Sequence, residues 1–296
     1  MKILITGSTG FIGRELIVYL RNRHELICLG LYSENFDDCI FDNCKIIKTD
    51  YSYNDLIDKL PVVDGIIHLA FQKASSENEN GGMTSYFPSI QLSENLIKVA
   101  KEKGISNVVT TSSRCVYGTY TNDMFCEEDQ TNSINYYGVA KICVEQLFEY
   151  YNTTYNLNYK SLRLGQVIGK ELKENSVFTT FFKNAIANLP LTITTNDIRD
   201  YVYITDVCKA INVAIEHTNH RGIYNVSIGK GYSNRDLAEN IIDILDSDST
   251  IETKNDSDIS KTTRIILNNN KFLKTFNYQC EYDIQKIIHE IKNNIE

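Results

Sequence analysis

The chain has 296 residues, of which 42% are hydrophobic and 23% are charged, and its formal net charge is −8. These values are typical of a globular protein with a real core, and the chain has no basic stripe that could neutralise the phosphates of a nucleic acid. No apolar run approaches the roughly 20 residues that a membrane-spanning helix needs, so we expect neither nucleic acid nor membrane as a partner.

The eight cysteines are scattered, with no CxxC pair and no His/Cys cluster at zinc spacing. We therefore expect ordinary thiols in a reducing compartment and no structural metal. The chain opens on MKILIT, an apolar run that resembles a strand and lacks the basic segment of a signal peptide. Together these features predict a cytoplasmic protein.

Apolar runs alternate with amphipathic segments over the first 165 residues. Strands are predicted at 2–6, 25–30, 45–48, 65–70, 107–113 and 159–165, and helices at 11–23, 54–60, 85–103 and 135–151. Apolar, β-branched strands that alternate with helices are typical of a parallel sheet covered on both faces. The predicted fold class is therefore α/β with a doubly wound parallel sheet.

The pattern becomes looser after residue 165. Helices are predicted near 176–188, 205–217, 233–246 and 282–293, and short strands at 191–194 and 223–227. Ser233 and Asp236 have the spacing of a capping box with an acidic third residue. We predict a larger domain at 1–165 and a smaller mixed domain at 166–296 that rests on the carboxyl edge of the sheet, with some segments crossing back to the first domain.

A glycine-rich turn, TGSTGFIGR, joins the first predicted strand to the first helix. Gly7 permits a tight turn, Gly10 lets the backbone approach a pyrophosphate, and Gly13 lets the helix pack on the strand. The amino end of the helix supplies free N–H groups for the anion. This arrangement predicts a Rossmann-type dinucleotide site, whose candidate residues are Gly7, Thr9, Gly10, Phe11, Ile12, Gly13, Arg14, Asp50, Tyr51, Leu69 and Ala70.

The second strand lacks the acidic residue that normally binds the adenosine ribose, because Gly30 stands at that point. No carboxylate is therefore expected to bind a 2′-hydroxyl or to repel a 2′-phosphate. Arg14 could meet such a phosphate or could be a solvated helix residue. Asp50 could reach the adenine edge or could cap the next helix. The cofactor is predicted to be NADP or NAD.

The motifs resemble those of the extended short-chain dehydrogenase/reductase family, particularly its nucleotide-sugar epimerases, dehydratases and 4-keto reductases. The resemblance is carried by TGSTGFIG (6–13), HLA (68–70), TSSRCVYG (111–118), YGVAK (137–141), RLGQVIG (163–169), RDYVYITDV (199–207) and YNVSIGKGYS (224–233). It implies a Rossmann domain that binds NAD(P) and a smaller domain that binds a nucleotide-diphospho-sugar.

Tyr137 and Lys141 match the family's YxxxK pair, and the four-residue spacing places them on one helix face, whereas Tyr136 faces elsewhere. The resemblance implies that the Tyr137 phenol transfers a proton. A base at neutral pH needs its pKa lowered by roughly three units, about 4 kcal/mol, and a cation ~5 Å away supplies about 3 kcal/mol. Lys141 would supply most of this lowering, and an oxidised nicotinamide the rest.

Ser113 lies four residues before the tyrosine of the VYG element, where the resemblance implies a hydroxyl that binds the reacting sugar oxygen. The 4,6-dehydratases of the family carry an Asp-Glu pair where this chain has Arg114 and Cys115, so loss of water is not expected. Cys115 matches the position of a proton-transfer cysteine in 3,5-epimerising members, although a small buried thiol is the simpler interpretation.

On the substrate side, the resemblance implies that Arg199, and near the end of the chain Arg264, grip the diphosphate. Gln166 stands where the family usually has an asparagine, and the resemblance implies that it contacts the substrate. The polar segment 72–82 could serve as a lid.

The reading favoured by these features is hydride transfer at C4 of a nucleotide-diphospho-sugar, with a lean toward a 4-keto-sugar reductase. The alternatives are a 4-epimerase that retains NAD, a 3,5-epimerase that uses Cys115, and a non-catalytic dinucleotide sensor. The family implies a homodimer formed by the helices at 85–103 and 138–151. Their apolar stripes (Leu92, Leu96, Val99, Val144, Leu147 and Phe148) also suit packing within one chain.

Overall fold

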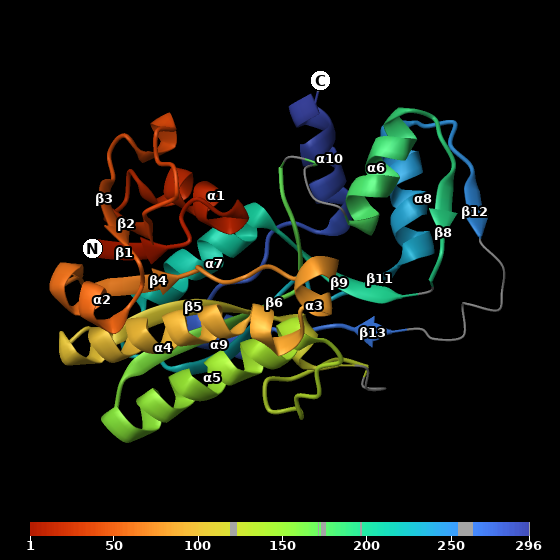
Figure 1. The fold of residues 1–296 in the computed structure, drawn as a ribbon. Coiled ribbons are helices and arrows are strands. Elements are labelled where there is room, and N and C mark those ends of the chain that lie inside the picture. Colours follow the sequence, from red (N-terminus) through yellow and green to blue (C-terminus); the bar gives the residue numbers. More distant parts are fainter. Residues whose placement is uncertain (119–122, 171, 173–175, 196, 254–262, 296) are drawn as a thin grey trace.

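The computed structural model describes residues 1–118, 123–170, 172, 176–195, 197–253 and 263–295. At its centre is a seven-stranded parallel sheet in the order β10-β6-β5-β4-β1-β2-β3 (Figure 1). Its strands are β1 (Lys2–Thr6), β2 (Glu25–Leu31), β3 (Lys45–Thr49), β4 (Gly65–His68), β5 (Asn107–Ser113), β6 (Asn158–Leu164) and β10 (Gly222–Val226).

Helices cover both faces of this sheet (Figure 1). One face holds α1 (Phe11–Leu20) and α7 (Ile204–Glu216), and the other holds α2 (Tyr53–Lys59), α4 (Phe87–Glu102) and α5 (Tyr136–Tyr155). Because side chains alternate along a strand, Ile3 and Ile5 pack with the first group and Leu4 with the second. No helix in the described ranges is both long and apolar enough to cross a membrane.

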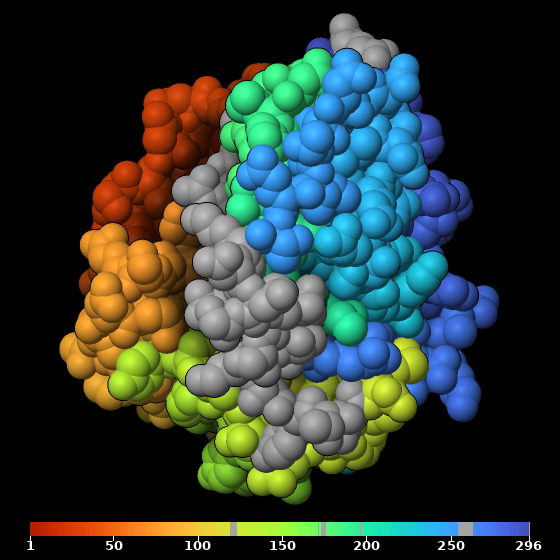
Figure 2. Space-filling view, turned by 90° about the vertical axis from the view of Figure 1, so that its right-hand side faces the viewer, coloured from red at the N-terminus to blue at the C-terminus, as the bar shows by residue number. Residues whose placement is uncertain are grey.

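A smaller mixed sheet surrounds β9 (Ile198–Tyr203), which pairs in parallel with β7 (Gln166–Ile168) and β13 (Arg264–Ile265) and antiparallel with β11 (Gly231–Ser233). A separate parallel pair joins β8 (Leu191–Ile193) to β12 (Ile251–Thr253). Three helices, α6 (Val177–Ile186), α8 (Asn234–Leu245) and α10 (Ile284–Ile295), enclose an apolar core with these strands. This second body lies beside the first hundred residues in Figure 2. The predicted fold class is confirmed.

Three segments from the later part of the chain belong to the large sheet. Strand β10 extends the sheet beyond β6, α7 packs under its centre, and α9 (Asn270–Phe276) packs against β10. The strand predicted at 223–227 therefore lies in the first body, and the division near residue 165 stays a prediction.

The predicted element boundaries differ from the structure by a few residues. The strand predicted at 65–70 ends at His68, so that Leu69 and Ala70 are free to approach the glycine-rich turn. Helix α5 continues to Tyr155 and is ended by Asn156, whose φ of 51° lies in the left-handed region. The predicted capping box is confirmed, because Ser233 and Asp236 exchange hydrogen bonds at the start of α8.

Candidate active site

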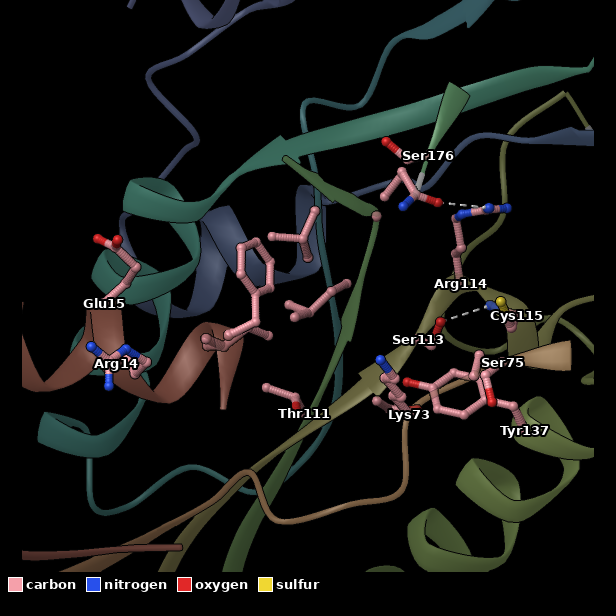
Figure 3. Close-up of a pocket in the computed structure, with 18 of the residues that line it drawn as sticks. Arg14, Glu15, Lys73, Ser75, Thr111, Ser113, Arg114, Cys115, Tyr137 and Ser176 are labelled. Carbon is pink, nitrogen blue, oxygen red and sulfur yellow. Dashed lines mark hydrogen bonds between the residues drawn. The ribbon is translucent and has the colours of Figure 1, made fainter. Parts of the chain in front are cut away.

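A cleft of about 1140 Å³ opens at the carboxyl ends of the central strands. It is lined by α1, by the segment after β4, by the end of β5, by Tyr137 and by residues 164–167. In open α/β sheets ligands bind at this edge. In Figure 3, Arg14 and Glu15 of α1 lie on one side of the cleft, and Ser113, Tyr137, Lys73 and Arg114 lie on the other.

The glycine-rich turn is as tight as its sequence predicts. Gly7 has a φ of +67°, and a Cβ there would lie 2.6 Å from the backbone nitrogen of Ala70. A Cβ on Gly13 would lie 2.2 Å from the carbonyl oxygen of Gly7. Gly10 begins α1 without a side-chain cap, so the first N–H groups of the helix keep their hydrogen-bonding capacity for an anion. This cradle fits a pyrophosphate.

A carboxylate does lie at the end of β2, although the sequence predicted none there. Glu34 accepts hydrogen bonds from the Thr9 hydroxyl at 2.8 Å and from the Leu31 backbone at 3.2 Å. A Cβ on Gly30 would lie 2.7 Å from the Glu34 carboxylate and 2.5 Å from the Phe36 ring. The prediction was wrong because the loop after β2 turns back, and Glu34 fills the space beside Gly30.

Three other predicted cofactor residues are held by contacts within the protein. Arg14 pairs with Asp38, and the guanidinium lowers the pKa of that carboxyl group. Asp50 accepts from the backbone of Ser52, the residue that caps α2. The Tyr51 ring is buried and donates its hydroxyl to the carbonyl of Leu29, so only the backbone of Tyr51 is available to a cofactor.

The structure brings Ser113, Tyr137 and Lys141 together as predicted. Ser113 ends β5, and Tyr137 lies in the first turn of α5, where both line the cleft. Lys141 is buried on the same helix face, and its Nζ lies 5.7 Å from the centre of the Tyr137 ring and donates to the Thr111 carbonyl at 2.9 Å. Tyr136 is 46% exposed and does not line the cleft.

Burial is the main cause of the pKa shifts of Tyr137 and Lys141. It raises the pKa of Tyr137 above the ordinary value, Cys115 and Tyr86 raise it further, and the hydrogen bond with Ser113 opposes the rise. Burial also lowers the pKa of Lys141 to about 7, against the attraction of Glu145. Without a cofactor, burial therefore determines the protonation of the phenol. The lowering of its pKa by Lys141 together with an oxidised nicotinamide stays a prediction.

A set of residues that holds the amino end of α5 in place had no signal in the sequence. The predicted lid contains α3 (Ser76–Asn80), and Glu79 on it accepts from the backbone N–H groups of Tyr136 and Tyr137, both at 2.9 Å, and from the Tyr86 hydroxyl at 2.8 Å. Burial would raise the pKa of Glu79, but these hydrogen bonds outweigh it, and the pKa is lowered.

Phe71 completes this set beneath Tyr137 and Lys141. Its ring lies edge-on to Tyr137 at 6.0 Å between centres, and Lys141 Nζ lies 3.7 Å above its face. An aromatic ring in contact with both groups excludes water and stabilises the ammonium group. An aromatic residue just after HLA in the sequence was the only signal that could have predicted this contact.

The predicted substrate residues divide into two groups. Gln166 of β7 lines the cleft and accepts from Arg114 at 3.2 Å. Arg199 and Arg264 lie on the paired strands β9 and β13, and among the described lining residues of the cleft neither is present. They pair with Asp197 at 2.9 Å and Asp123 at 3.7 Å. This geometry does not support their contact with a diphosphate, which stays a prediction.

Cys115 is half-buried at the cleft wall, where its backbone N–H donates to the Ser113 hydroxyl at 3.2 Å. This contact orients Ser113 and gives the Cys115 thiol no chemical role, so proton transfer by the thiol stays a prediction. Among the described residues no group of three His, Cys, Asp or Glu side chains could hold a metal ion.

Residues 3–227 match the model of the NAD dependent epimerase/dehydratase family. The chain belongs to this family. It is therefore an NAD-dependent enzyme of the epimerase/dehydratase type, and the resemblance inferred from its motifs is confirmed.

Similar proteins share the whole architecture. A UDP-glucose 4-epimerase of Corynebacterium glutamicum is 24% identical over 81% of this chain and 79% of its own. The structure of UDP-N-acetylglucosamine 4-epimerase from Bacillus cereus aligns with a TM-score of 0.86 at 24% identity, covering 100% of this chain and 96% of that one. UDP-glucose 4-epimerase from Thermus thermophilus, solved with NAD, aligns with a TM-score of 0.81 at 20% identity, covering 99% of both chains.

The residues at the cleft fit the cofactor of this family. The turn from Gly7 to Gly13 leaves room for a backbone-bound pyrophosphate, and Glu34 offers an acceptor for ribose hydroxyls. Leu69 and Ala70 would flank the bound dinucleotide, because their backbones contact Gly7. When bound, NAD supplies an acceptor and donor of hydride.

Proposed function

We propose that this protein is a nucleotide-diphospho-sugar 4-epimerase that retains its NAD. The observation that carries the proposal is the meeting of Ser113 and Tyr137 at one side of a cleft whose other side begins at the glycine-rich turn. A sugar hydroxyl placed between these side chains would lie where a proton can be removed while a hydride leaves the same carbon.

The protein residues have distinct roles in this reaction. Tyr137 accepts the proton of the C4 hydroxyl as that carbon is oxidised, and returns it after the sugar has presented its other face. Ser113 donates a hydrogen bond to the same oxygen and holds it in reach of Tyr137. Lys141, buried beside the phenol, favours its ionised form whenever the amine is protonated.

The preference for an epimerase over a 4-keto reductase rests on the edge of β2. A net reductase must exchange its reduced cofactor at each turnover. The prediction of a reductase depended on the absence of a carboxylate at this edge, because such an edge would accept NADPH. Glu34 lies at this edge, and Arg14 is already paired with Asp38. A carboxylate there repels a 2′-phosphate and binds a 2′-hydroxyl, which supports NAD.

Three other functions are less well supported: dehydration, non-catalytic sensing and 3,5-epimerisation. Dehydration needs an acid and a base beside the sugar, and the corresponding positions hold Arg114 and Cys115. A non-catalytic sensor would have no need of a lysine buried beside a phenol, because burying an ammonium group is costly. The Cys115 thiol has no partner among the described residues that would favour its role in a 3,5-epimerisation.

The test is to purify the protein, identify the nucleotide that it carries, and assay UDP-glucose/UDP-galactose and UDP-N-acetylglucosamine/UDP-N-acetylgalactosamine interconversion. We expect bound NAD and turnover without added cofactor. Turnover of a 4-keto-sugar nucleotide that depends on added NADPH would favour the reductase instead. Tight NAD binding without turnover of any nucleotide sugar would favour the sensor.

A further inference from the structure

The cationic side chains around the cleft differ in whether a carboxylate pairs with them. On the α1 side, Arg14 pairs with Asp38, and Glu15 pairs with Lys170 at 3.0 Å. On the opposite side, Arg114 and Lys73 line the cleft without a carboxylate within ion-pair distance among the described residues. The side of the cleft that holds the proton-transfer residues is therefore cationic.

Arg114 belongs to the same rigid turn as the catalytic hydroxyl. It begins the short helix η3 (Arg114–Val116), which Ser113 caps by accepting from the Cys115 backbone. Its guanidinium donates to Gln166 Oε1 at 3.2 Å, and Figure 3 shows this contact at the cleft wall. Gln166 thus orients the guanidinium from the neighbouring body and leaves most of its five N–H groups for a ligand.

The groups gathered here are almost all hydrogen-bond donors. Arg114 and Lys73 have no acceptor atoms, and the Gln166 carbonyl is already engaged, so its amide NH₂ remains as a donor. A half-buried guanidinium that lacks a carboxylate partner is unfavourable unless a ligand supplies the negative charge. The ligand atoms that meet this wall are therefore expected to be anionic acceptors.

The position of Arg114, Lys73 and Gln166 in the cleft indicates which part of the ligand carries the negative charge. This step rests on the proposed function, in which the C4 hydroxyl lies between Ser113 and Tyr137. Because Arg114 directly follows Ser113 and lines the same cleft, we take the substituent that meets it to be one on a carbon next to C4. In a hexose those carbons are C3, with its hydroxyl, and C5, which carries C6.

We propose that the substrate sugar carries a carboxylate beside its reacting carbon, as a hexuronic acid does at C6, and that Arg114 binds it. The planar guanidinium suits the two oxygens of a carboxylate, and Gln166 holds the plane of the fork in place. Lys73 adds a second positive charge on the same side. A neutral hexose offers only a hydroxyl there, which leaves the guanidinium charge uncompensated.

The experiment measures the dissociation constants of UDP-glucuronate, UDP-glucose and UDP by calorimetry with the NAD-loaded protein. We expect UDP-glucuronate to bind at least about tenfold more tightly than UDP-glucose, the ratio that one charge-assisted hydrogen bond provides. Arg114→Met should lose most of this ratio, and Arg114→Lys should keep part of it. Arg235→Met, which removes an exposed arginine of α8 far from the cleft, should keep the ratio of the unaltered protein.

The outcomes separate this inference from the proposed function. Equal affinities for the two sugars in the unaltered protein would overturn the inference, even if UDP-glucose is epimerised. A loss of UDP affinity in Arg114→Met as large as the loss for UDP-glucuronate would show that Arg114 binds the diphosphate instead. Selective binding of UDP-glucuronate without its epimerisation would keep the inference and contradict the function.

Discussion

At the scale of single residues, Tyr136 and Tyr137 follow one another in the chain but meet different surroundings. Tyr137 lines the cleft beside Ser113, and Tyr136 is exposed outside it. Tyr137→Phe removes the proton-transfer group and should lower kcat by about 10²–10⁴-fold while NAD binding stays nearly intact. Tyr136→Phe is the matched control and should have a mild effect. Similar losses in both variants would contradict the assignment.

Glu34 should decide between the two dinucleotides. Its carboxylate accepts from Thr9 and fills the space beside Gly30. Fluorescence titration of nucleotide-free protein should show tighter binding of NADH than of NADPH. Glu34→Ala should narrow this difference by about tenfold, because it removes an acceptor for the ribose and a charge that repels a phosphate.

The control for that titration is Glu239→Ala, which removes an exposed carboxylate of α8 and should leave the difference unchanged. If the unaltered protein binds NADPH more tightly than NADH, Glu34 does not bind the 2′-hydroxyl of the ribose. It would also remove the support for an epimerase over a reductase.

Lys141 makes the stability of the nucleotide-free protein depend on pH. Burial lowers its pKa to about 7, whereas the pKa in the unfolded chain keeps its ordinary value of 10.5. Between these values the unfolded state binds more protons, so this group makes the free energy of unfolding rise from pH 7 to 10.5. Lys141→Met should remove that rise and raise the melting temperature at pH 7, since burying the charge costs on the order of a few kcal/mol.

The same variant should lack activity, which would show that Lys141 lowers the stability of the protein but is required for catalysis. Denaturant unfolding at pH 7 and pH 9.5 measures the effect in both proteins. If the unfolding free energy changes between pH 7 and pH 9.5 by the same amount in the unaltered protein and in Lys141→Met, the pKa of Lys141 is not lowered.

The roles of some of these residues could be predicted from the sequence and those of others could not, for a physical reason. Tyr137 and Lys141 were found because a four-residue spacing on a helix fixes their common face. Glu34 was missed because its position depends on the path of a loop, which no periodic pattern reports. The raised pKa of Tyr137 in the protein without cofactor had no signal in the sequence, because burial beside Phe71 and Tyr86 becomes visible only in three dimensions.

At the scale of elements, α3 and the amino end of α5 are joined on one side of the cleft (Figure 3). The Glu79 carboxylate accepts two backbone N–H groups at the amino end of α5, where a negative charge is favourable. Glu79→Ala should lower stability by about 1 kcal/mol, the value of a helix cap, and lower kcat several-fold, because Tyr137 lies in the released turn. Glu77→Ala, an exposed residue of the same helix, is the control.

Thermal unfolding and steady-state kinetics of both variants test this contact. If Glu79→Ala lowers stability but leaves kcat unchanged, the contact is structural only and does not position Tyr137. The link joins residues 57 and 58 positions apart, so neither the cap nor the lid segment showed it in the sequence.

The elements themselves were largely predictable. Strands buried on both faces have continuous apolar runs, and the six predicted in the first 165 residues all lie in the large sheet. The pairing of β10 was not predictable, since an apolar run of five residues does not indicate which sheet it joins. The loops after β2 and β4 were harder still, because their contacts come from single side chains.

At the scale of the whole molecule, the apolar stripes of α4 and α5 pack within one chain. Leu96, Val99, Val144 and Phe148 are buried in the core with the sheet, and Leu92 and Leu147 pack against it. The homodimer therefore loses the support of these stripes and rests on the family resemblance. Light scattering at micromolar concentration should give about twice the chain mass of 33.9 kDa. A mass equal to one chain would refute the dimer.

The return of β10 to the large sheet ties a later part of the chain to the first body. A fragment that stopped at Gly165 would leave the backbone of β6 unpaired along one edge, and α7 would no longer cover the apolar residues beneath β1 and β5. Such exposed edges and apolar faces lead to aggregation. A premature stop codon ahead of α7 and β10 would therefore also impair nucleotide binding, because the body that carries the glycine-rich turn would be left incomplete.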